Sequence, residues 1–305
     1  MAGTAVRLGV LVLPEHPGPE GVRPWRVAEE LGFDHAWTLD HLSWRTLRER
    51  PWFDAMTTLT AAACHTGRIA LGTLVASPNF RHPVVTAKEA MTLDHVSGGR
   101  FVLGVGAGAP GPDGAALGGP EPAAAGRATR FEEFVTLVDR LLRQPVTTFS
   151  GRFYTAEDIR MIPGCVRRPR LPLAVAATGA RGMRLAAGLG DMWVTIGDAG
   201  VPGGQSEAEA FATLRGQLDR LTRACRSAGR PPGDVRRLVN LSRVVAEPYG
   251  SPERLADLVG RCAELGFTDV VLAYPREEGV FAGDMRAFEE AVTRVTGVTG
   301  QRGSD

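Results

Sequence analysis

The chain has 305 residues, of which 44% are hydrophobic and 23% charged, and its formal net charge is +1. This composition is ordinary for a globular protein, and the small net charge gives no general attraction to nucleic acid or to an anionic membrane. We find no apolar run near the ~20 residues of a membrane span and no signal-peptide pattern at the start. The sequence therefore predicts a cytoplasmic protein that binds neither membranes nor nucleic acid.

The spacing of cysteine, histidine and lysine excludes several kinds of chemistry. No two cysteines form a CxxC pair, which predicts free buried thiols rather than a zinc site or disulfides; they stand at positions 64, 165, 225 and 262. His16, His41 and His82 follow different predicted strands without an HxH pair, so we expect no metal site. The only lysine, Lys88, falls in mid-helix, which argues against a Schiff-base mechanism.

Short apolar runs alternate with amphipathic stretches along the whole chain. The predicted strands span residues 6–13, 33–39, 69–75, 101–106, 172–177, 191–195, 237–245 and 268–273. The predicted helices span residues 24–31, 54–65, 82–97, 127–142, 181–187, 207–228, 251–266 and 284–295. This alternation predicts one (β/α)8 TIM-barrel domain over residues 1–305, and a doubly wound open sheet is the alternative.

The segment 68–109 gives the clearest pattern, with two apolar strands and one helix between them. Pro83 falls where a missing N–H costs nothing, and Gly98-Gly99 provides the left-handed backbone that helix ends favour. The unit predicts parallel strands with a right-handed crossover. Because ligands of parallel sheets sit at the carboxyl ends of strands, residues 75–78 and 106–108 are candidates for ligand contact.

Two insertions interrupt the alternation. Residues 107–126 are rich in Gly, Ala and Pro, which predicts a mobile loop and a candidate lid over a strand end. Residues 146–170 contain VTTFSGRFY, which predicts a short hairpin. We place both insertions at the carboxyl-terminal face of the barrel.

Asp40-His41 ends the second predicted strand, within the expected active-site mouth. A histidine there can donate or accept a proton near neutral pH. The alternative is a packed loop histidine that bonds to backbone. Glu15, at the end of the first strand, is a second ionisable group near the mouth, and a solvated loop charge is its alternative interpretation.

Two further patterns indicate a bound ligand. Ala177-Thr178-Gly179-Ala180 joins a strand to a helix start, where free N–H groups favour a phosphate, although an ordinary βα turn has the same residues. Trp44 and Trp52 flank the loop after the second strand and either wall a pocket for a flat ligand or pin the loop to the barrel. The glycines at 104, 106 and 108 lack the third glycine of a Rossmann fingerprint, and prolines follow them, so we reject a dinucleotide site.

Three blocks of the sequence together resemble the luciferase-like monooxygenase superfamily. They are Asp40-His41, then GTLVASPNFRHPVVTAKEAMTLDHVSGGRFVLGVGAG, then PLAVAATGARGMRLAAGLGDMW, and they span about half of the chain. The resemblance implies a TIM barrel in which a non-prolyl cis peptide, here Leu74–Val75, packs behind an isoalloxazine-type ring.

Within this superfamily the chain looks most like the branch that uses the deazaflavin coenzyme F420. That resemblance implies that Asp40 and His41 face the ring. It implies further coenzyme contacts at the strand-three exit, at the glycines after strand four and at the phosphate loop; these residues are Leu74, Val75, Ala76, Ser77, Gly106, Ala107, Gly108, Ala177, Thr178, Gly179 and Ala180. The substrate pocket is expected to include Glu15, Trp44 and Trp52.

The resemblance implies an oxidoreductase that moves a hydride between the coenzyme and a C=C, C=N or C=O group of a small molecule. His41 would transfer the accompanying proton, oriented by Asp40. Sugar-phosphate dehydrogenases of the branch carry a glutamate where this chain has Ala109, and no basic phosphate clamp is evident, which argues against glucose 6-phosphate. The alternatives are a monooxygenase that uses FMN and oxygen, and a non-catalytic flavin-binding barrel. The resemblance also implies a homodimer.

Overall fold

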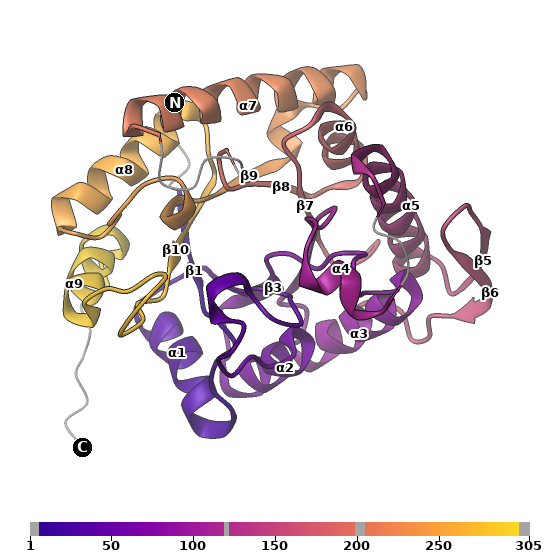
Figure 1. Cartoon of the computed structure of the whole chain (residues 1–305), viewed down its shortest axis with the longest axis horizontal. Coiled ribbons are helices and arrows are strands. Elements are labelled where there is room, and N and C mark those ends of the chain that lie inside the picture. The colour runs from indigo at the N-terminus through magenta and orange to yellow at the C-terminus, as the bar shows by residue number, and fades with distance from the viewer. Residues whose placement is uncertain (1–5, 119–121, 199–204, 299–305) are drawn as a thin grey trace.

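The computed structural model describes residues 6–118, 122–198 and 205–298, and its centre is a closed barrel of eight parallel strands (Figure 1). Neighbouring strands follow the order β1-β10-β9-β8-β7-β4-β3-β2, and β1 pairs with both β10 and β2, which closes the ring. The barrel strands are β1 (Arg7–Leu11), β2 (His35–Thr38), β3 (Ala70–Thr73), β4 (Phe101–Val105), β7 (Leu173–Ala176), β8 (Met192–Thr195), β9 (Arg236–Asn240) and β10 (Asp269–Ala273). The predicted (β/α)8 barrel is confirmed, and the open sheet is excluded.

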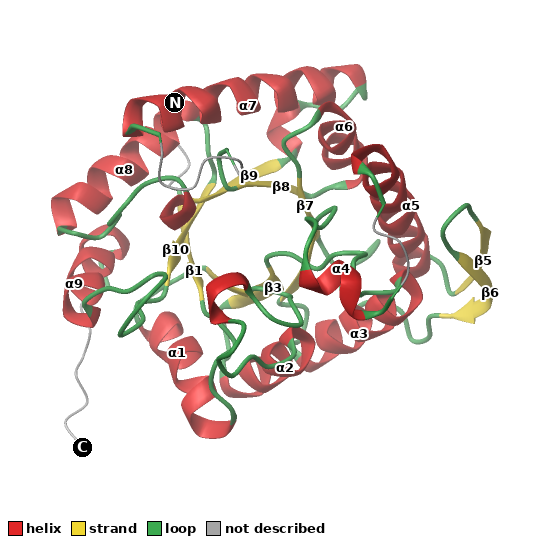
Figure 2. Ribbon diagram, in the orientation of Figure 1, coloured by secondary structure: helices red, strands yellow, loops and turns green. Residues whose placement is uncertain are grey.

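Helices surround the ring of strands, as Figure 2 shows. Their bounds are α1 (Gly18–Glu30), α2 (Ala55–His65), α3 (Pro83–Val96), α5 (Ala124–Arg143), α6 (Ala180–Leu189), α7 (Glu207–Ser227), α8 (Pro252–Leu265) and α9 (Met285–Thr296). Within the described ranges no helix is both long enough and apolar enough to cross a membrane. The antiparallel pair β5 (Val146–Ser150) and β6 (Thr155–Arg160) projects outward beyond α5, which confirms the predicted hairpin (Figure 1). Its predicted place at the carboxyl-terminal face was wrong, because this segment connects the end of α5 to the start of β7 and contributes nothing to the lining of the cavity at that face.

The unit β3-α3-β4 follows its predicted pattern. Ala87 and Met91 of α3 are buried against the barrel, so burial of this apolar stripe fixes the helix on the strands. Gly98 and Gly99 end the helix at φ values of 63° and 85°, where a side chain would be strained. β3 and β4 pair in parallel, and their carboxyl ends therefore meet at one edge of the barrel.

Two predicted boundaries and the predicted burial of one cysteine were wrong. α1 begins at Gly18 rather than at Pro24, because Pro19 occupies its first turn and the buried face of the helix continues through Pro24. The seventh strand ends at Asn240, where its pairing with β10 ends, and a 3-10 turn (Leu241–Arg243) follows. Cys64 is exposed, whereas the other three cysteines are buried as predicted.

The glycine-rich insertion contains more structure than its composition predicts. Residues Pro112–Ala116 form a short helix, α4, and α5 begins at Ala124, so the predicted loop over 107–126 was wrong in these parts. Pro112 suits the first turn of a helix, and Asp113 accepts the Leu42 N–H at 3.0 Å, which ties α4 to the loop after β2. Residues 119–121 lie outside the described part of the chain.

A buried polar cluster lies at the amino-terminal ends of the strands. Trp37 Nε1 donates to His35 Nδ1 at 2.7 Å, which leaves His35 Nε2 to donate to Asp269 Oδ1 at 3.0 Å. Arg236 also donates to Asp269. Contacts with His35 and Arg236 hold the pKa of Asp269 well below its usual range, even though burial acts in the opposite direction. The barrel is therefore filled by paired polar groups at this end.

Candidate active site

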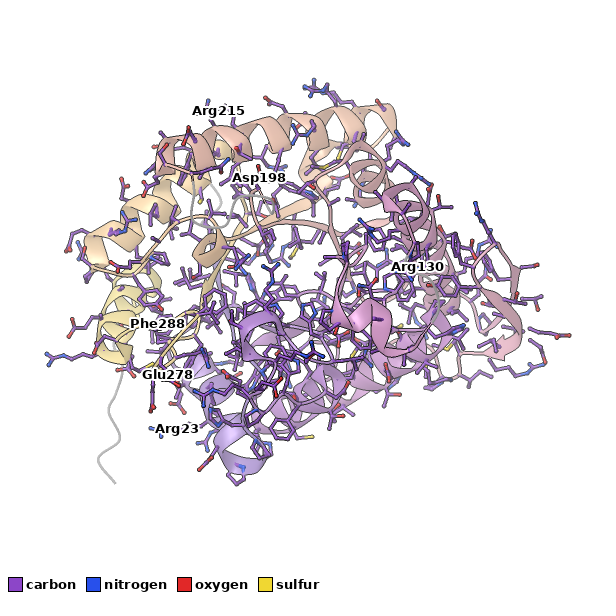
Figure 3. The ribbon with its side chains drawn as sticks, in the orientation of Figure 1. Arg23, Arg130, Asp198, Arg215, Glu278 and Phe288 are labelled. Carbon is purple, nitrogen blue, oxygen red and sulfur yellow. The ribbon has the colours of Figure 1, made fainter. Side chains whose placement is uncertain are left out.

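A cavity of about 860 Å³ opens at the carboxyl ends of the strands. Residues at or just beyond six strands line it: Leu39, Leu74, Ala107, Ala177, Thr195 and Asn240. This is the end of a parallel barrel at which ligands bind. Side chains from the surrounding loops reach into the ring (Figure 3), and Arg130 of α5 donates to Asn79 Oδ1 at 2.6 Å, which fixes α5 to the loop after β3.

The exits of β3 and β4 form one side of the cavity. The Leu74–Val75 peptide bond is cis, as the family resemblance implies. Gly106 has no room for a side chain, because a Cβ atom there would lie 2.5 Å from Val75 Cγ2. Leu74 and Val75 line the cavity together with Ser77, Ala107 and Gly108, whereas Ala76 and Gly106 lie behind this surface, in the pairing between the two strand exits.

His41 lines the same cavity and is held by a carboxylate from another part of the chain. Its Nδ1 lies 2.5 Å from Asp113 Oδ2 on α4. Asp113 is buried, while the His41 side chain keeps 34% of its surface exposed. The backbone carbonyl of His41 also accepts a hydrogen bond from Trp52 Nε1 at 2.8 Å. The histidine is thus oriented from two sides and remains accessible from the cavity.

Asp113 is a residue that we did not predict. Its segment is so rich in Gly, Ala and Pro that it shows no amphipathic pattern. The one available signal was a carboxylate behind a proline, which is typical of a helix start.

Asp40 does not orient His41, which corrects our expectation. Its carboxylate accepts two hydrogen bonds from Arg81, at 2.7 and 3.0 Å, and Arg81 also donates to Asp54. Successive side chains of an extended segment point in opposite directions, so Asp40 turns away from the cavity where His41 faces it. Burial raises the pKa of Asp40, while the bonds and the charge of Arg81 oppose this shift.

The amino terminus of α6 faces the cavity without a side-chain cap. Gly179 is the N-cap residue, and no side chain bonds the first turn of the helix. Thr178 and Ala180 line the cavity beside it. A Cβ atom on Gly179 would meet nothing within 4 Å, so the approach to the free N–H groups is open. Backbone N–H groups and the helix dipole favour an anion such as phosphate at this place.

The three predicted pocket residues have different surroundings. Trp44 lines the cavity and stacks on Trp52, with ring centres 6.0 Å apart. Trp52 lies behind it and does not line the cavity. Glu15 accepts hydrogen bonds from Arg276 at 2.6 and 2.8 Å and is turned away from the cavity by this ion pair. The expected place of Trp52 and Glu15 in the pocket wall was therefore wrong.

Across residues 6–118, 122–198 and 205–298, no three His, Cys, Asp or Glu side chains converge as metal ligands would. The polar groups that line the cavity are instead one histidine, one uncapped helix terminus, three arginines, two carboxylates and several hydroxyl and amide side chains. This set favours a flat organic ligand with an anionic end.

Comparison with known proteins places the chain in a family. Residues 6–249 match the family model of luciferase-like monooxygenases. The F420-dependent glucose-6-phosphate dehydrogenase of Intrasporangium calvum is 33% identical over 253 residues, which cover 75% of this chain and 74% of that protein. The chain belongs to the luciferase-like monooxygenase family and is an enzyme of that family.

Other relatives match over a smaller share of their length. The F420-dependent glucose-6-phosphate dehydrogenase of Beutenbergia cavernae is 37% identical over 201 residues, 64% of this chain and 58% of that protein. The 4-hydroxyprotoasukamycin monooxygenase of Streptomyces nodosus is 36% identical over 211 residues, 65% of this chain and 54% of that protein. The chain therefore spans little more than half the length of these two relatives.

The fold has close structural counterparts. An F420-dependent secondary alcohol dehydrogenase in complex with an F420-acetone adduct superimposes with a TM-score of 0.78 at 19% identity, over 95% of this chain and 97% of that one. The coenzyme F420-dependent tetrahydromethanopterin reductase of Methanopyrus kandleri gives 0.73 at 19% identity, over 95% and 97%. At this identity the likeness shows the shared barrel alone.

Proposed function

We propose that this chain is a coenzyme F420-dependent oxidoreductase that acts on a small organic molecule. The observation that carries the proposal is the convergence of His41, the strand-three exit and the uncapped α6 terminus on one cavity. Relatives of the chain with F420 in their names add support. When bound, the deazaflavin offers carbon in place of flavin N5 and exchanges a hydride in two-electron steps.

The residues present fit such a coenzyme. The cis segment at Leu74–Val75 and the backbone of Ala107 and Gly108 would hold the ring, since they give an apolar surface with little side-chain bulk. The open N–H groups at Gly179 would bind a phosphate. Asp40 would contribute indirectly, because its pair with Arg81 fixes the strand-two exit beside the ring.

His41 would hold and move the proton that accompanies the hydride. If the proton on Nδ1 is donated to Asp113, Nε2 is the nitrogen left to exchange a proton with the substrate. Asp113 would act as a positioning residue that fixes the imidazole ring of His41 and stabilises its imidazolium form. Because Asp113 belongs to α4, formation of this short helix would complete the site.

The substrate differs from that of the named sugar-phosphate relatives. Ala109 lines the cavity at the position where we expect the sugar-phosphate dehydrogenases to carry a glutamate. A methyl group cannot exchange a proton with a sugar hydroxyl. We therefore propose a substrate other than glucose 6-phosphate, even though these relatives are among the most similar proteins.

An FMN-dependent monooxygenase is the second candidate. The family model is that of luciferase-like monooxygenases, and the 4-hydroxyprotoasukamycin monooxygenase is 36% identical over its matched region. Both coenzymes present a flat ring and a phosphate, so the cavity accommodates either kind of ligand.

Anaerobic single-turnover measurements test the proposal. Protein loaded with reduced F420 is mixed with a panel of activated C=C, C=N and C=O compounds, and coenzyme oxidation is followed with wild type and His41→Ala. We expect turnover by wild type and an F420 affinity of the variant within about twofold, with strongly reduced turnover. Full turnover by His41→Ala would remove the histidine from this role, and F420 binding without turnover in either direction would indicate a non-catalytic barrel.

The homodimer and the cytoplasmic location stay predictions. Light scattering of the purified protein and cell fractionation test them.

A further inference from the structure

Two arginines of the cavity lack acidic partners. Arg243 ends the 3-10 turn after β9, and Arg45 begins a 3-10 turn (Arg45–Leu47) after β2; both line the cavity. Among the described residues neither makes a hydrogen bond or an ion pair, although the Arg45 guanidinium lies 6.0 Å from the centre of the Trp44 ring. By contrast, the acids of the cavity wall are already engaged, Asp113 with His41 and Glu132 with Arg181.

The two arginines line the same cavity, and the positive charge of one acts on the other. Arg243 is half-buried, and burial together with the positive charge of Arg45 lowers its pKa. Two like charges at the rim of a cavity repel each other and lose hydration, so a structure that keeps both without a carboxylate favours an anion between them. Arg45 also adopts φ 42°, in the left-handed region that non-glycine residues seldom occupy.

Their position separates them from the α6 terminus. In the ring order, β9 and β2 lie two and three strands away from β7, which leads into α6. Arg243 and Arg45 therefore reach the cavity from loops that do not neighbour Gly179. We expect the anion that they bind to be a different group from the one at α6, and a titration with F420 checks this.

The same side of the cavity offers a polar atom and an aromatic wall. Asn240, at the carboxyl end of β9, is 2% exposed, and its Oδ1 has no hydrogen-bond partner among the described residues. A buried, unpaired amide oxygen costs free energy until a ligand donates to it. Trp44 stacks on Phe281 at 6.0 Å between ring centres, and both line the cavity. These groups suit a flat, apolar body with a donor group.

We propose that the substrate of this enzyme is a small organic anion, whose carboxylate or phosphate is bound by Arg243 and Arg45 while its body lies against Trp44 and Phe281. This proposal rests on the function proposed above and names the substrate class for that site. It is compatible with Ala109, since the anion is recognised by arginines from loops after β2 and β9 rather than by that position. The sequence showed no basic clamp for an anionic group, and these two arginines of the cavity correct that expectation.

Binding of benzoate and its neutral analogue benzamide tests the proposal on the coenzyme-free protein. Calorimetric titration of wild type should give benzoate an affinity about tenfold or more above that of benzamide, since bonds to charged groups are the strong ones. Arg243→Gln and Arg45→Gln should each reduce this preference at least severalfold. The matched control is Arg215→Gln, an exposed arginine on the outer helix α7, which should keep it (Figure 3).

Equal binding of benzoate and benzamide by wild type, or a benzoate preference that survives in both cavity variants, would overturn the proposal. A second titration, with F420 already bound, separates the two anion sites. Benzoate and F420 binding together supports a substrate site, whereas competitive displacement of F420 by benzoate would assign the arginines to the coenzyme and refute it. If F420 fails to bind while benzoate keeps its preference, the proposed coenzyme is wrong and the anion site stands.

Discussion

The described residues include two His–Asp pairs, and their surroundings differ in almost every respect. His35 and Asp269 meet at 3.0 Å at the amino-terminal ends of the strands, with side-chain exposures of 3% and 0%. His41 and Asp113 meet at 2.5 Å beyond the carboxyl ends, with exposures of 34% and 9%. One pair joins two strands of the barrel, and the other joins a strand exit to an inserted helix.

The comparison shows that the residue types alone do not decide the role. Every polar atom of the His35 ring is used, since Nδ1 accepts from Trp37 and Nε2 bonds Asp269. The His41 ring bonds through Nδ1 alone among the described residues and faces a cavity of about 860 Å³. A histidine with a free nitrogen next to a cavity can exchange protons with a ligand, whereas a fully bonded one stabilises the fold.

The largest effect is expected at the buried pair. Asp269→Ala leaves His35 and Arg236 without their carboxylate, and loss of one partner of a buried ionic cluster costs about 3–5 kcal/mol. We expect the free energy of unfolding to fall by that amount in denaturant titrations. The surface variant Asp257→Ala, on the exposed face of α8, is the control, and a loss below about 1 kcal/mol for Asp269→Ala would contradict a structural role.

At the open pair we expect loss of activity with little loss of stability. His41→Ala should lower single-turnover rates by about 100-fold or more, which is the usual contribution of a positioned acid or base. Its free energy of unfolding should stay within about 1 kcal/mol of wild type, because the ring is one-third exposed. If His41→Ala loses as much free energy of unfolding as Asp269→Ala, the proposed difference between the two pairs is wrong.

Asp113→Asn tests whether the inserted helix positions the histidine. Loss of the charge-assisted bond should lower the rate about tenfold to a hundredfold, the equivalent of about 1.5–3 kcal/mol. The loss should fall on the turnover rate and leave F420 affinity within about twofold, because the carboxylate holds the imidazole of His41. Asp158→Asn, in the outer hairpin, is the matched control, and an Asp113→Asn variant that keeps the full turnover rate, or loses F420 affinity as much as turnover, would leave this residue with a structural role alone.

The pH dependence of stability should also separate the pairs. The pKa of Asp269 is lowered in the folded state, so its stabilisation is present above the ordinary carboxyl pKa of about 3.9 and is lost as the pH falls below it. Between about pH 5 and pH 3 wild type should therefore lose more stability than Asp269→Asn. Parallel curves for the two proteins in acid denaturation would argue against this assignment.

A change remote from both pairs should have the smallest effect. Ser206 caps α7, accepting the Glu209 N–H while Glu209 accepts from the Ser206 backbone. Ser206→Ala should cost about 1 kcal/mol of stability and leave turnover unchanged. Thermal unfolding and the single-turnover rate, measured on one sample, check both parts.

The sequence predicts those parts of the molecule whose signals are local. Apolar runs and helix-ending glycines such as Gly98 identify the strands and helices, and a contiguous motif identifies the cis bond after β3. Even a local signal can mislead. We predicted that α1 begins at Pro24, which has no N–H, but the helix continues through this residue because its buried face does.

Contacts between distant segments could not be predicted. His41 and Asp113 are 72 residues apart in the sequence. The charge of Arg45 acts on Arg243 only because the strands close into a barrel. The partner of Glu15 is likewise distant in sequence, 261 residues away at Arg276. Side-chain direction at a strand exit decides such contacts, and a single sequence has no signal for it.

A titration of the purified, coenzyme-free protein with F420 and, separately, with FMN tests the central claim most directly, because it asks whether the cavity beside His41 is a deazaflavin site. Quenching of tryptophan fluorescence reports binding, since Trp44 lines the cavity. We predict saturation by F420 at one equivalent per chain with an affinity at least about tenfold above that for FMN. Tighter binding of FMN, or no saturable quenching by either coenzyme, would contradict the account.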